Sequence, residues 1–142
     1  MMEKLKILNL SHSKYLKSTP DFTKLPNLEK LIMKDCPSLS DVHPSIGDLK
    51  NLHLINLKGC TNLGNLPRNI YQLKSVKTLN LSGCSKIDKL EEDIVQMESL
   101  TTLIAENTAV TQVLDVTNNE LLTSYSPFWG HAIVSSFLGR RE

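Results

Sequence analysis

One sequence pattern recurs at a nearly fixed interval along most of this chain. Its clearest copy begins at Leu52 and reads LHLINLKGCTNLGNLPRNIYQLKS. The copy that follows repeats its apolar residues and its cysteine in the same phase. Five copies begin at Leu5, Leu28, Leu52, Val76 and Leu100, at intervals of 23, 24, 24 and 24 residues. A unit this short cannot bury its own apolar side, so we expect successive units to stack on one another.

Each copy opens with an L-x-x-L-x-L segment, in which inward and outward residues alternate as they do in a β-strand. A small residue follows the last of these leucines, where the chain turns inward and backbone groups need partners. These residues are Ser13, Cys36, Cys60, Cys84 and Thr108. A pattern of this kind with a period of roughly 20–29 residues is the signature of a leucine-rich repeat. We predict an α/β leucine-rich-repeat solenoid of five repeats, with a parallel sheet on its concave side.

The rest of each repeat predicts a turn and a return path. Gly59 and Gly83 suit a tight turn with unusual backbone angles. Residues 44–49, 67–73 and 91–97 carry apolar pairs at i and i+3, which predict short helical or irregular segments on the convex side. The repeat pattern stops after Val113, so we divide the chain into a solenoid over residues 1–113 and a non-repeat tail over residues 114–142.

Composition narrows the classes of partner. The net charge of +1 gives no footprint for nucleic acid. No apolar run approaches the roughly 18 residues of a membrane span, and the first residues do not resemble a secretory signal. Three cysteines in one repeat phase indicate a structural role in a reducing compartment. We therefore expect no membrane association and a cytoplasmic location, with the nucleus as the second option.

Catalytic and metal chemistry find little support in the sequence. The four histidines, at positions 12, 43, 53 and 131, lie in different phases of the repeat, so no Ser/His/Asp or Cys/His set converges. A zinc site usually needs four ligands, and no C-x-x-C motif occurs. The three cysteines are better explained as a buried ladder. We expect no enzyme activity, no metal, no cofactor and no small-molecule substrate.

The outward residues of the predicted strands form the candidate binding face, because solenoids bind proteins along this extended surface. We expect the exposed isoleucines and leucine to form one apolar line in a single strand column, with asparagines beside it and a modest basic patch of lysines. An exposed apolar row marks an interaction site more often than chance. The candidates are Ile7, Asn9, Lys30, Ile32, Lys34, Leu54, Asn56, Lys58, Lys77, Asn80 and Ile104.

The amino-acid motifs within the repeats are more specific than the repeat period. LNLSHS, TPDF, EKLIMKDC, SIG and the repeated LxGC, which all lie within residues 8–84, resemble a family of plant intracellular immune receptors. This family comprises the Toll/interleukin-receptor–nucleotide-binding–leucine-rich-repeat disease resistance proteins. The resemblance covers roughly residues 4–113. It implies a protein-interaction module that recognises a pathogen effector or restrains the receptor's nucleotide-binding ATPase module. No G-x-x-x-x-G-K-[ST] phosphate-binding motif occurs in the 142 residues.

Two alternatives to a recognition module remain open. The chain could act as a truncated regulator or decoy that docks on the nucleotide-binding module of a related receptor. It could also be a non-functional remnant whose open sheet edges favour aggregation. Selective co-purification with the nucleotide-binding module favours the first alternative, and poor solubility with fast proteolysis favours the second.

Overall fold

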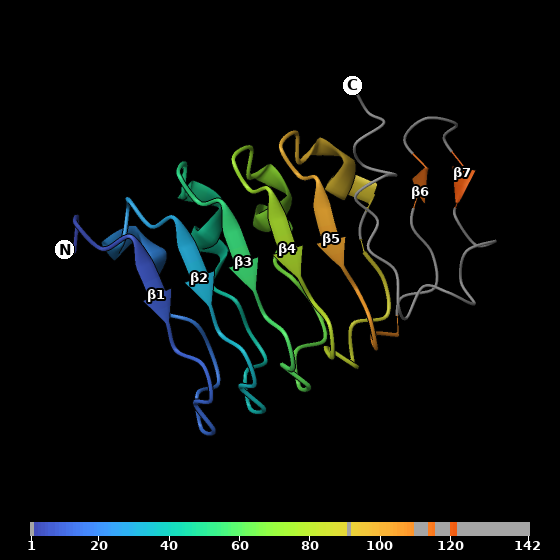
Figure 1. Cartoon of the computed structure of the whole chain (residues 1–142), viewed down its shortest axis with the longest axis horizontal. Helices are drawn as coiled ribbons and strands as arrows, with labels where there is room; N and C mark the ends of the chain where they lie inside the picture. Colours follow the sequence, from blue (N-terminus) through green and yellow to red (C-terminus); the bar gives the residue numbers. More distant parts are fainter. Residues whose placement is uncertain (1, 91, 110–113, 116–119, 122–142) are drawn as a thin grey trace.

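The five predicted strands form one sheet. The computed structural model describes residues 2–90, 92–109, 114–115 and 120–121. Neighbouring strands follow chain order, as Figure 1 shows, and all four pairs are parallel. The strands are β1 (Ile7–Asn9), β2 (Lys30–Ile32), β3 (Leu54–Asn56), β4 (Thr78–Asn80) and β5 (Thr102–Ile104). The predicted parallel sheet is confirmed.

The same hydrogen bonds join each repeat to the next. The carbonyl oxygen of Lys6 accepts the N–H groups of both Glu29 and Lys30, at 2.7 and 3.0 Å. The equivalent carbonyl of the next repeat accepts two N–H groups in the same way, and this continues to β5. At the other end of the strands, the N–H of Leu10 donates to the carbonyl of Ile32 at 2.9 Å, again with equivalents along the sheet. Since every junction uses one bonding scheme, the repeats stack in constant register.

The return path of each of the first four repeats contains a short 3-10 helix, drawn behind the sheet in Figure 1. The predicted helical segments over residues 44–49, 67–73 and 91–97 are confirmed, and a further segment, η1, was not predicted. A helical segment of three to five residues is too short for a stable α-helix, whereas the tighter 3-10 helix occurs in segments of this length. The helices are η1 (Phe22–Lys24), η2 (Pro44–Asp48), η3 (Arg68–Gln72) and η4 (Glu92–Gln96).

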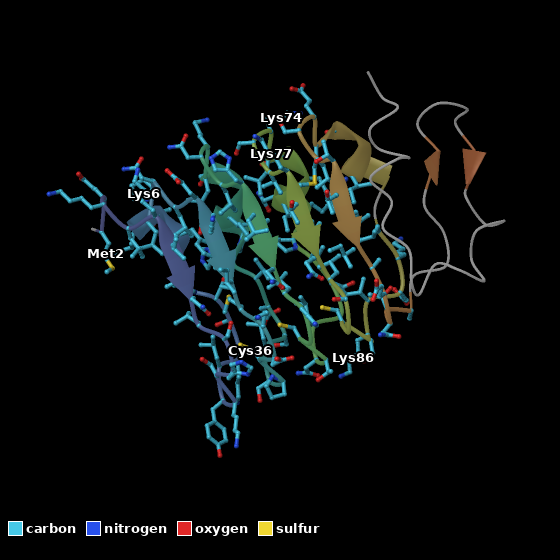
Figure 2. The ribbon with its side chains drawn as sticks, in the orientation of Figure 1. Met2, Lys6, Cys36, Lys74, Lys77 and Lys86 are labelled. Carbon is cyan, nitrogen blue, oxygen red and sulfur yellow. The ribbon has the colours of Figure 1, made fainter. Side chains whose placement is uncertain are left out.

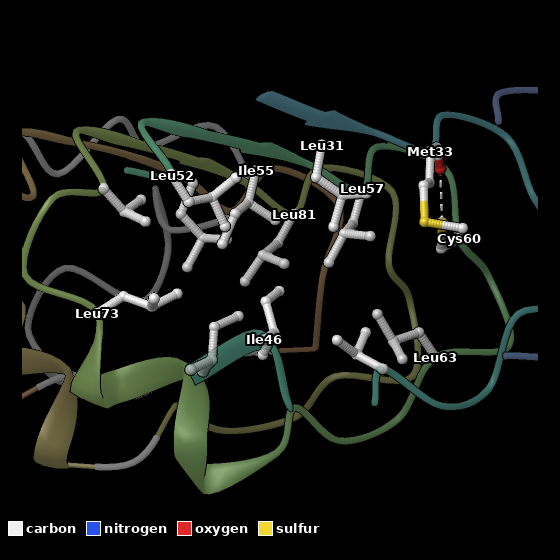
Figure 3. Packing of buried hydrophobic residues seen from close by; sticks show 14 of the residues in the cluster. Leu31, Met33, Ile46, Leu52, Ile55, Leu57, Cys60, Leu63, Leu73 and Leu81 are labelled. Carbon is white, nitrogen blue, oxygen red and sulfur yellow. Dashed lines mark hydrogen bonds between the residues drawn. The ribbon is translucent and has the colours of Figure 1, made fainter. Parts of the chain in front are cut away.

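One continuous apolar core lies between the strands and the 3-10 helices (Figure 3). Ile55 and Leu57 face it from β3 and its continuation, and Ile46 and Leu73 face it from the return paths. All four are at most 2% exposed. In the first repeat, Leu5 and Leu8 are only partly buried, while their counterparts in the second repeat have no exposed surface.

Every repeat has a left-handed residue two positions after its last strand leucine or equivalent. The predicted unusual angles of Gly59 and Gly83 are confirmed, at φ +78° and +77°. His12, Asp35 and Asn107 occupy the same place in the other repeats, with φ between +55° and +64°. The sequence reasoning missed these three, although Asn, Asp and His are the side chains that tolerate this conformation best. The sharp turn at the end of each strand therefore depends on a residue column and not on glycine alone.

Beyond the five repeats, two residues at Leu114–Asp115 (β6) pair antiparallel with Glu120–Leu121 (β7). The predicted boundary at residue 113 stays a prediction. The remaining residues of the predicted tail, 116–119 and 122–142, lie outside the described ones. Among the described residues, no helix has the length and apolar character that crossing a membrane requires.

Candidate functional site

The candidate site is the outward side of the five-stranded sheet, which we call the strand face. The central residue of each strand from β2 to β5 is buried, while its two neighbours are exposed or half-buried and point the other way. The strand face therefore has two rows within the sheet. The first row is Ile7, Lys30, Leu54, Thr78 and Thr102, and the second row is Asn9, Ile32, Asn56, Asn80 and Ile104.

The prediction of a single apolar line is wrong. Ile7 and Leu54 lie in the first row, whereas Ile32 and Ile104 lie in the second. Ile7 and Ile32 differ in their position within the repeat, since Ile7 is the third residue of its repeat and Ile32 is the fifth. Outward positions in a strand are two residues apart, so these two side chains lie in different rows. Ile7, Ile32 and Leu54 alternate between the two rows over three consecutive strands. Ile104 is separated from them by β4.

The three asparagines of the second row have a structural task. Oδ1 of Asn9, Asn56 and Asn80 accepts the backbone N–H two residues later, at 3.0, 3.1 and 3.0 Å. This N–H lies just before the left-handed turn. The asparagines therefore secure the turn, as an Asx-turn does. Their predicted part in binding stays a prediction.

The four lysines of the predicted basic patch form no ion pair with any described residue. Lys30 lies in the first row, and Lys77 stands just before β4. Lys34 and Lys58 occupy the same repeat position, just after β2 and β3 end. The two segments are neighbours, since the N–H of Asp35 donates to the carbonyl of Lys58 at 2.7 Å. The strand face thus presents unpaired positive charge over β2, β3 and β4.

The two acidic residues that are next to these lysines in sequence have other partners. Oε2 of Glu29 lies 3.5 Å from Nζ of Lys6. Lys6 and Lys77 are labelled at the upper edge of the sheet in Figure 2. Oδ2 of Asp35 lies 3.7 Å from Nδ1 of His12. The lysines of β2 and β3 therefore remain without a carboxylate of their own.

The cysteines form the predicted structural ladder, which is confirmed. Cys36, Cys60 and Cys84 have no exposed surface and are not oxidised to disulfides. Each thiol donates to the carbonyl of the preceding repeat, as drawn for Cys60 and Met33 in Figure 3, at 3.3, 3.0 and 3.0 Å along the chain. Ser13 and Thr108 hold the same position but donate to the carbonyl of their own repeat. The larger sulfur atom spans the gap between repeats.

Burial makes these thiols poor nucleophiles. Desolvation raises the pKa of Cys60 to about 11 and that of Cys84 to about 12. Because the thiolate is the reactive form and all three thiols have no exposed surface, the folded chain should not react with Ellman's reagent at pH 8. We expect all three thiols to react only at the rate of unfolding, and rapidly in denaturant. Rapid reaction of two or three thiols in the native chain would contradict the ladder.

The same pKa values predict how stability depends on pH. An unfolded thiol has a pKa near its ordinary value of 9.0, and the folded thiol of Cys84 has a pKa of about 12. Above pH 9 the unfolded chain releases protons that the folded chain keeps, so unfolding becomes easier. We expect the stability advantage of the natural chain over Cys84→Ser to be constant below pH 9. It should then shrink toward pH 12, as urea denaturation at each pH would measure.

The remaining polar clusters hold the fold. His43 precedes η2, and its Nδ1 accepts the N–H of Ser45 at 3.1 Å. Oγ of Ser45 accepts the N–H of Phe22 from the previous repeat at 2.8 Å. A hydrogen bond from Thr23 N–H is the largest of several contacts that lower the pKa of Asp21. Within the described ranges, no group of three His, Cys, Asp or Glu side chains is placed to hold a metal.

Comparison with known proteins finds relatives of both the sequence and the fold. No family model matches the sequence. Over 47 residues, or 33% of this chain, it is 45% identical to the disease resistance proteins RUN1 and RPV1 of Vitis rotundifolia, covering 4% and 3% of their lengths. TMV resistance protein N of Nicotiana glutinosa is 49% identical over 43 residues, 30% of this chain and 4% of that protein. The chain thus matches a small part of each relative.

Among solved structures, the Leptospira interrogans LRR protein LIC12759 superimposes with a TM-score of 0.62 and 27% identity. The match covers 68% of this chain and 24% of that protein. The chain therefore has a leucine-rich-repeat fold, as predicted. Its repeats resemble those of plant disease resistance proteins, so the predicted resemblance is also confirmed.

Proposed function

We propose that this chain is a non-catalytic protein-interaction module of a plant intracellular immune receptor. Its partner would be either a pathogen effector or the nucleotide-binding module of a receptor, and its location the cytoplasm or the nucleus. The similarity to plant disease resistance proteins supports the setting, and the leucine-rich-repeat fold supports binding as the activity. The chain spans only 3–4% of the length of those relatives, so the activity of a complete receptor is proposed for it by similarity alone.

The observation that carries this proposal is the composition of the strand face. It combines exposed or half-buried aliphatic side chains, such as Ile7 and Leu54, with lysines that have no ion-pair partner. Ile7 is 52% exposed although it lies in a strand. Apolar side chains on an otherwise polar sheet are typical of a surface that another protein covers. The core, by contrast, uses its cysteines and leucines for stacking.

A set of variants tests the strand face as the interaction surface. A strand-face variant carries Ile7→Ser, Leu54→Ser and Ile104→Ser, and a control carries Tyr15→Ser and Gln72→Ser, two exposed changes elsewhere. Each protein is immobilised and offered the purified nucleotide-binding module of a similar receptor or infected leaf extract. Retained proteins are quantified by mass spectrometry.

We expect one protein or more to lose about tenfold in retention on the strand-face variant, since truncating central interface residues costs 1–2 kcal/mol or more. The control should retain the same proteins as the natural chain. Equal retention on all three chains would contradict the proposal, as would equal loss on both variants. Circular dichroism of each variant verifies that it is folded.

A further inference from the structure

The centre of the strand face, over β2 and β3, has a specific combination of charge and apolar surface. Lys30, Ile32 and Lys34 alternate along β2 and its continuation, so all three lie on the strand face. Leu54 pairs with Lys30 in the sheet register, and Lys58 lies beside Lys34. We call these five residues the lysine–aliphatic patch. Its two aliphatic side chains, Ile32 and Leu54, are half-buried and lie between the lysines.

The two lysines at one end of this patch are close neighbours. Parallel strands lie about 4.8 Å apart, and Lys34 and Lys58 occupy matching positions two residues after β2 and β3 end. Like charges on directly neighbouring strand positions are destabilising unless something compensates them. No described residue forms an ion pair with either. An anionic group from outside the chain would relieve this repulsion.

Asp35, the nearest acidic residue in sequence, is directed elsewhere. Its carboxylate lies against Gly59, where an added Cβ would collide with Oδ1, and it faces His12 on the other side. Asp35 itself adopts a left-handed conformation, with φ +55°, that turns its side chain out of the strand register. The lysine–aliphatic patch therefore keeps its positive charge.

We propose that the lysine–aliphatic patch binds an acidic protein segment with aliphatic residues between its carboxylates. This inference rests on the proposed function and specifies the chemistry of the partner. Ile32 and Leu54 would contact the aliphatic residues, and Lys34 and Lys58 would share the carboxylates at one end. Lys30 lies roughly 13 Å from Lys34 along the strand and meets the carboxylates at the other end, since a strand rises about 3.3 Å per residue. The match of charge and apolar surface selects this partner over a purely polar one.

A labelled peptide tests this binding directly. The probe is fluorescent Asp-Glu-Leu-Leu-Glu-Asp, titrated with the full chain and followed by anisotropy. We expect saturable binding that weakens when the salt concentration rises from about 0.1 M to about 1 M, because the Debye length falls from about 10 Å to about 3 Å. The counterparts Lys-Lys-Leu-Leu-Lys-Lys and Asp-Glu-Ser-Ser-Glu-Asp should each bind about tenfold more weakly.

A matched pair of charge reversals separates the lysine–aliphatic patch from net charge. Lys34→Glu with Lys58→Glu and the control Lys24→Glu with Lys50→Glu both change the net charge from +1 to −3, since each substitution removes two units. Lys24 and Lys50 lie at the end of η1 and after η2, away from the strand face. The first variant should bind the acidic peptide about tenfold more weakly, and the control within about twofold of the natural chain.

Several outcomes would overturn the inference. One is equal loss in the two charge-reversal variants, and another is equal binding of the acidic and basic peptides. A third is displacement of the acidic peptide by an oligothymidylate at matched concentration, which would assign the patch to nucleic acid. Failure of the peptide alone, while the strand-face variant still loses its retained proteins, overturns the acidic partner and leaves the interaction module standing. Failure of both experiments removes both.

Discussion

Replacing Leu79 by alanine should lower the free energy of unfolding by about 2–5 kcal/mol. Leu79 is the central residue of β4, has no exposed surface, and pairs in register with Ile55 and Leu103 on either side. In a stacked array each repeat contacts only its neighbours, so a cavity here weakens the junctions with β3 and β5 together. No equally damaging site is expected on the strand face.

Urea denaturation followed by circular dichroism measures this effect. The matched control is Thr78→Ala, one residue earlier on the same strand but half-buried on the strand face. The control should lose less than about 1 kcal/mol, in line with other surface substitutions. Equal losses at the two positions would mean that β4 does not alternate between core and strand face as described.

Gly83→Ala should cost about 1–3 kcal/mol, although it adds a single methyl group. Gly83 has φ +77°, a left-handed conformation that costs an L-residue roughly 1–2 kcal/mol. The new Cβ would also lie 3.3 Å from the backbone of Gly59. That backbone cannot easily yield, because the N–H of Gly59 donates to the carbonyl of Ser82 at 2.8 Å.

Two companion variants isolate the cause. Gly64→Ala should change stability by less than about 0.5 kcal/mol, since its Cβ would only touch Cβ of Lys86, at 3.9 Å. Gly83→Asn should lose less than Gly83→Ala, because asparagine tolerates this conformation and Asn107 already adopts it in the last repeat. Thermal unfolding of the three variants provides the comparison. A Gly64→Ala loss as large as that of Gly83→Ala would rule out the left-handed column as the reason.

The sequence was sufficient for the parts of the fold that repeat. A constant spacing of buried leucines and cysteines specifies both the strand register and the stacking direction, so the sheet and the thiol ladder were predictable from Cys36, Cys60 and Cys84. The short segments behind the sheet were predictable for the same reason, since Ile46 and Ile70 mark the same position in successive repeats. A single short apolar segment could be either a strand or part of a helix, and its recurrence in every repeat resolves this ambiguity.

The arrangement of the strand face was harder to predict. Outward residues experience no packing constraint that fixes their pattern, so a column assigned by residue type alone put Ile7 and Ile32 together although their repeat positions differ by two. Counting positions from the first leucine of each repeat would have found both rows. The structural role of Asn56, whose Oδ1 accepts the N–H of Lys58, could be identified only from the structure. In the sequence, an asparagine with such a role cannot be distinguished from any other exposed polar residue.

The fold separates the residues that stabilise it from the residues that we propose contact a partner. Leucines and thiols on the inner side fix the stacking, and the left-handed column forms the turn that ends each strand. In three repeats a second-row asparagine also secures this turn. The remaining outward side chains are free to differ between repeats without disturbing either system. Such a division suits a scaffold whose binding surface changes faster than its core.

Site-directed photo-crosslinking tests whether the strand face contacts the partner. Benzoylphenylalanine replaces Leu54 at the centre of the strand face, or Gln72 at the end of η3 on the opposite side. Each chain is irradiated in the presence of a retained protein. We expect a crosslinked species from position 54 and none from position 72. Crosslinking from position 72 without crosslinking from position 54 would contradict this expectation.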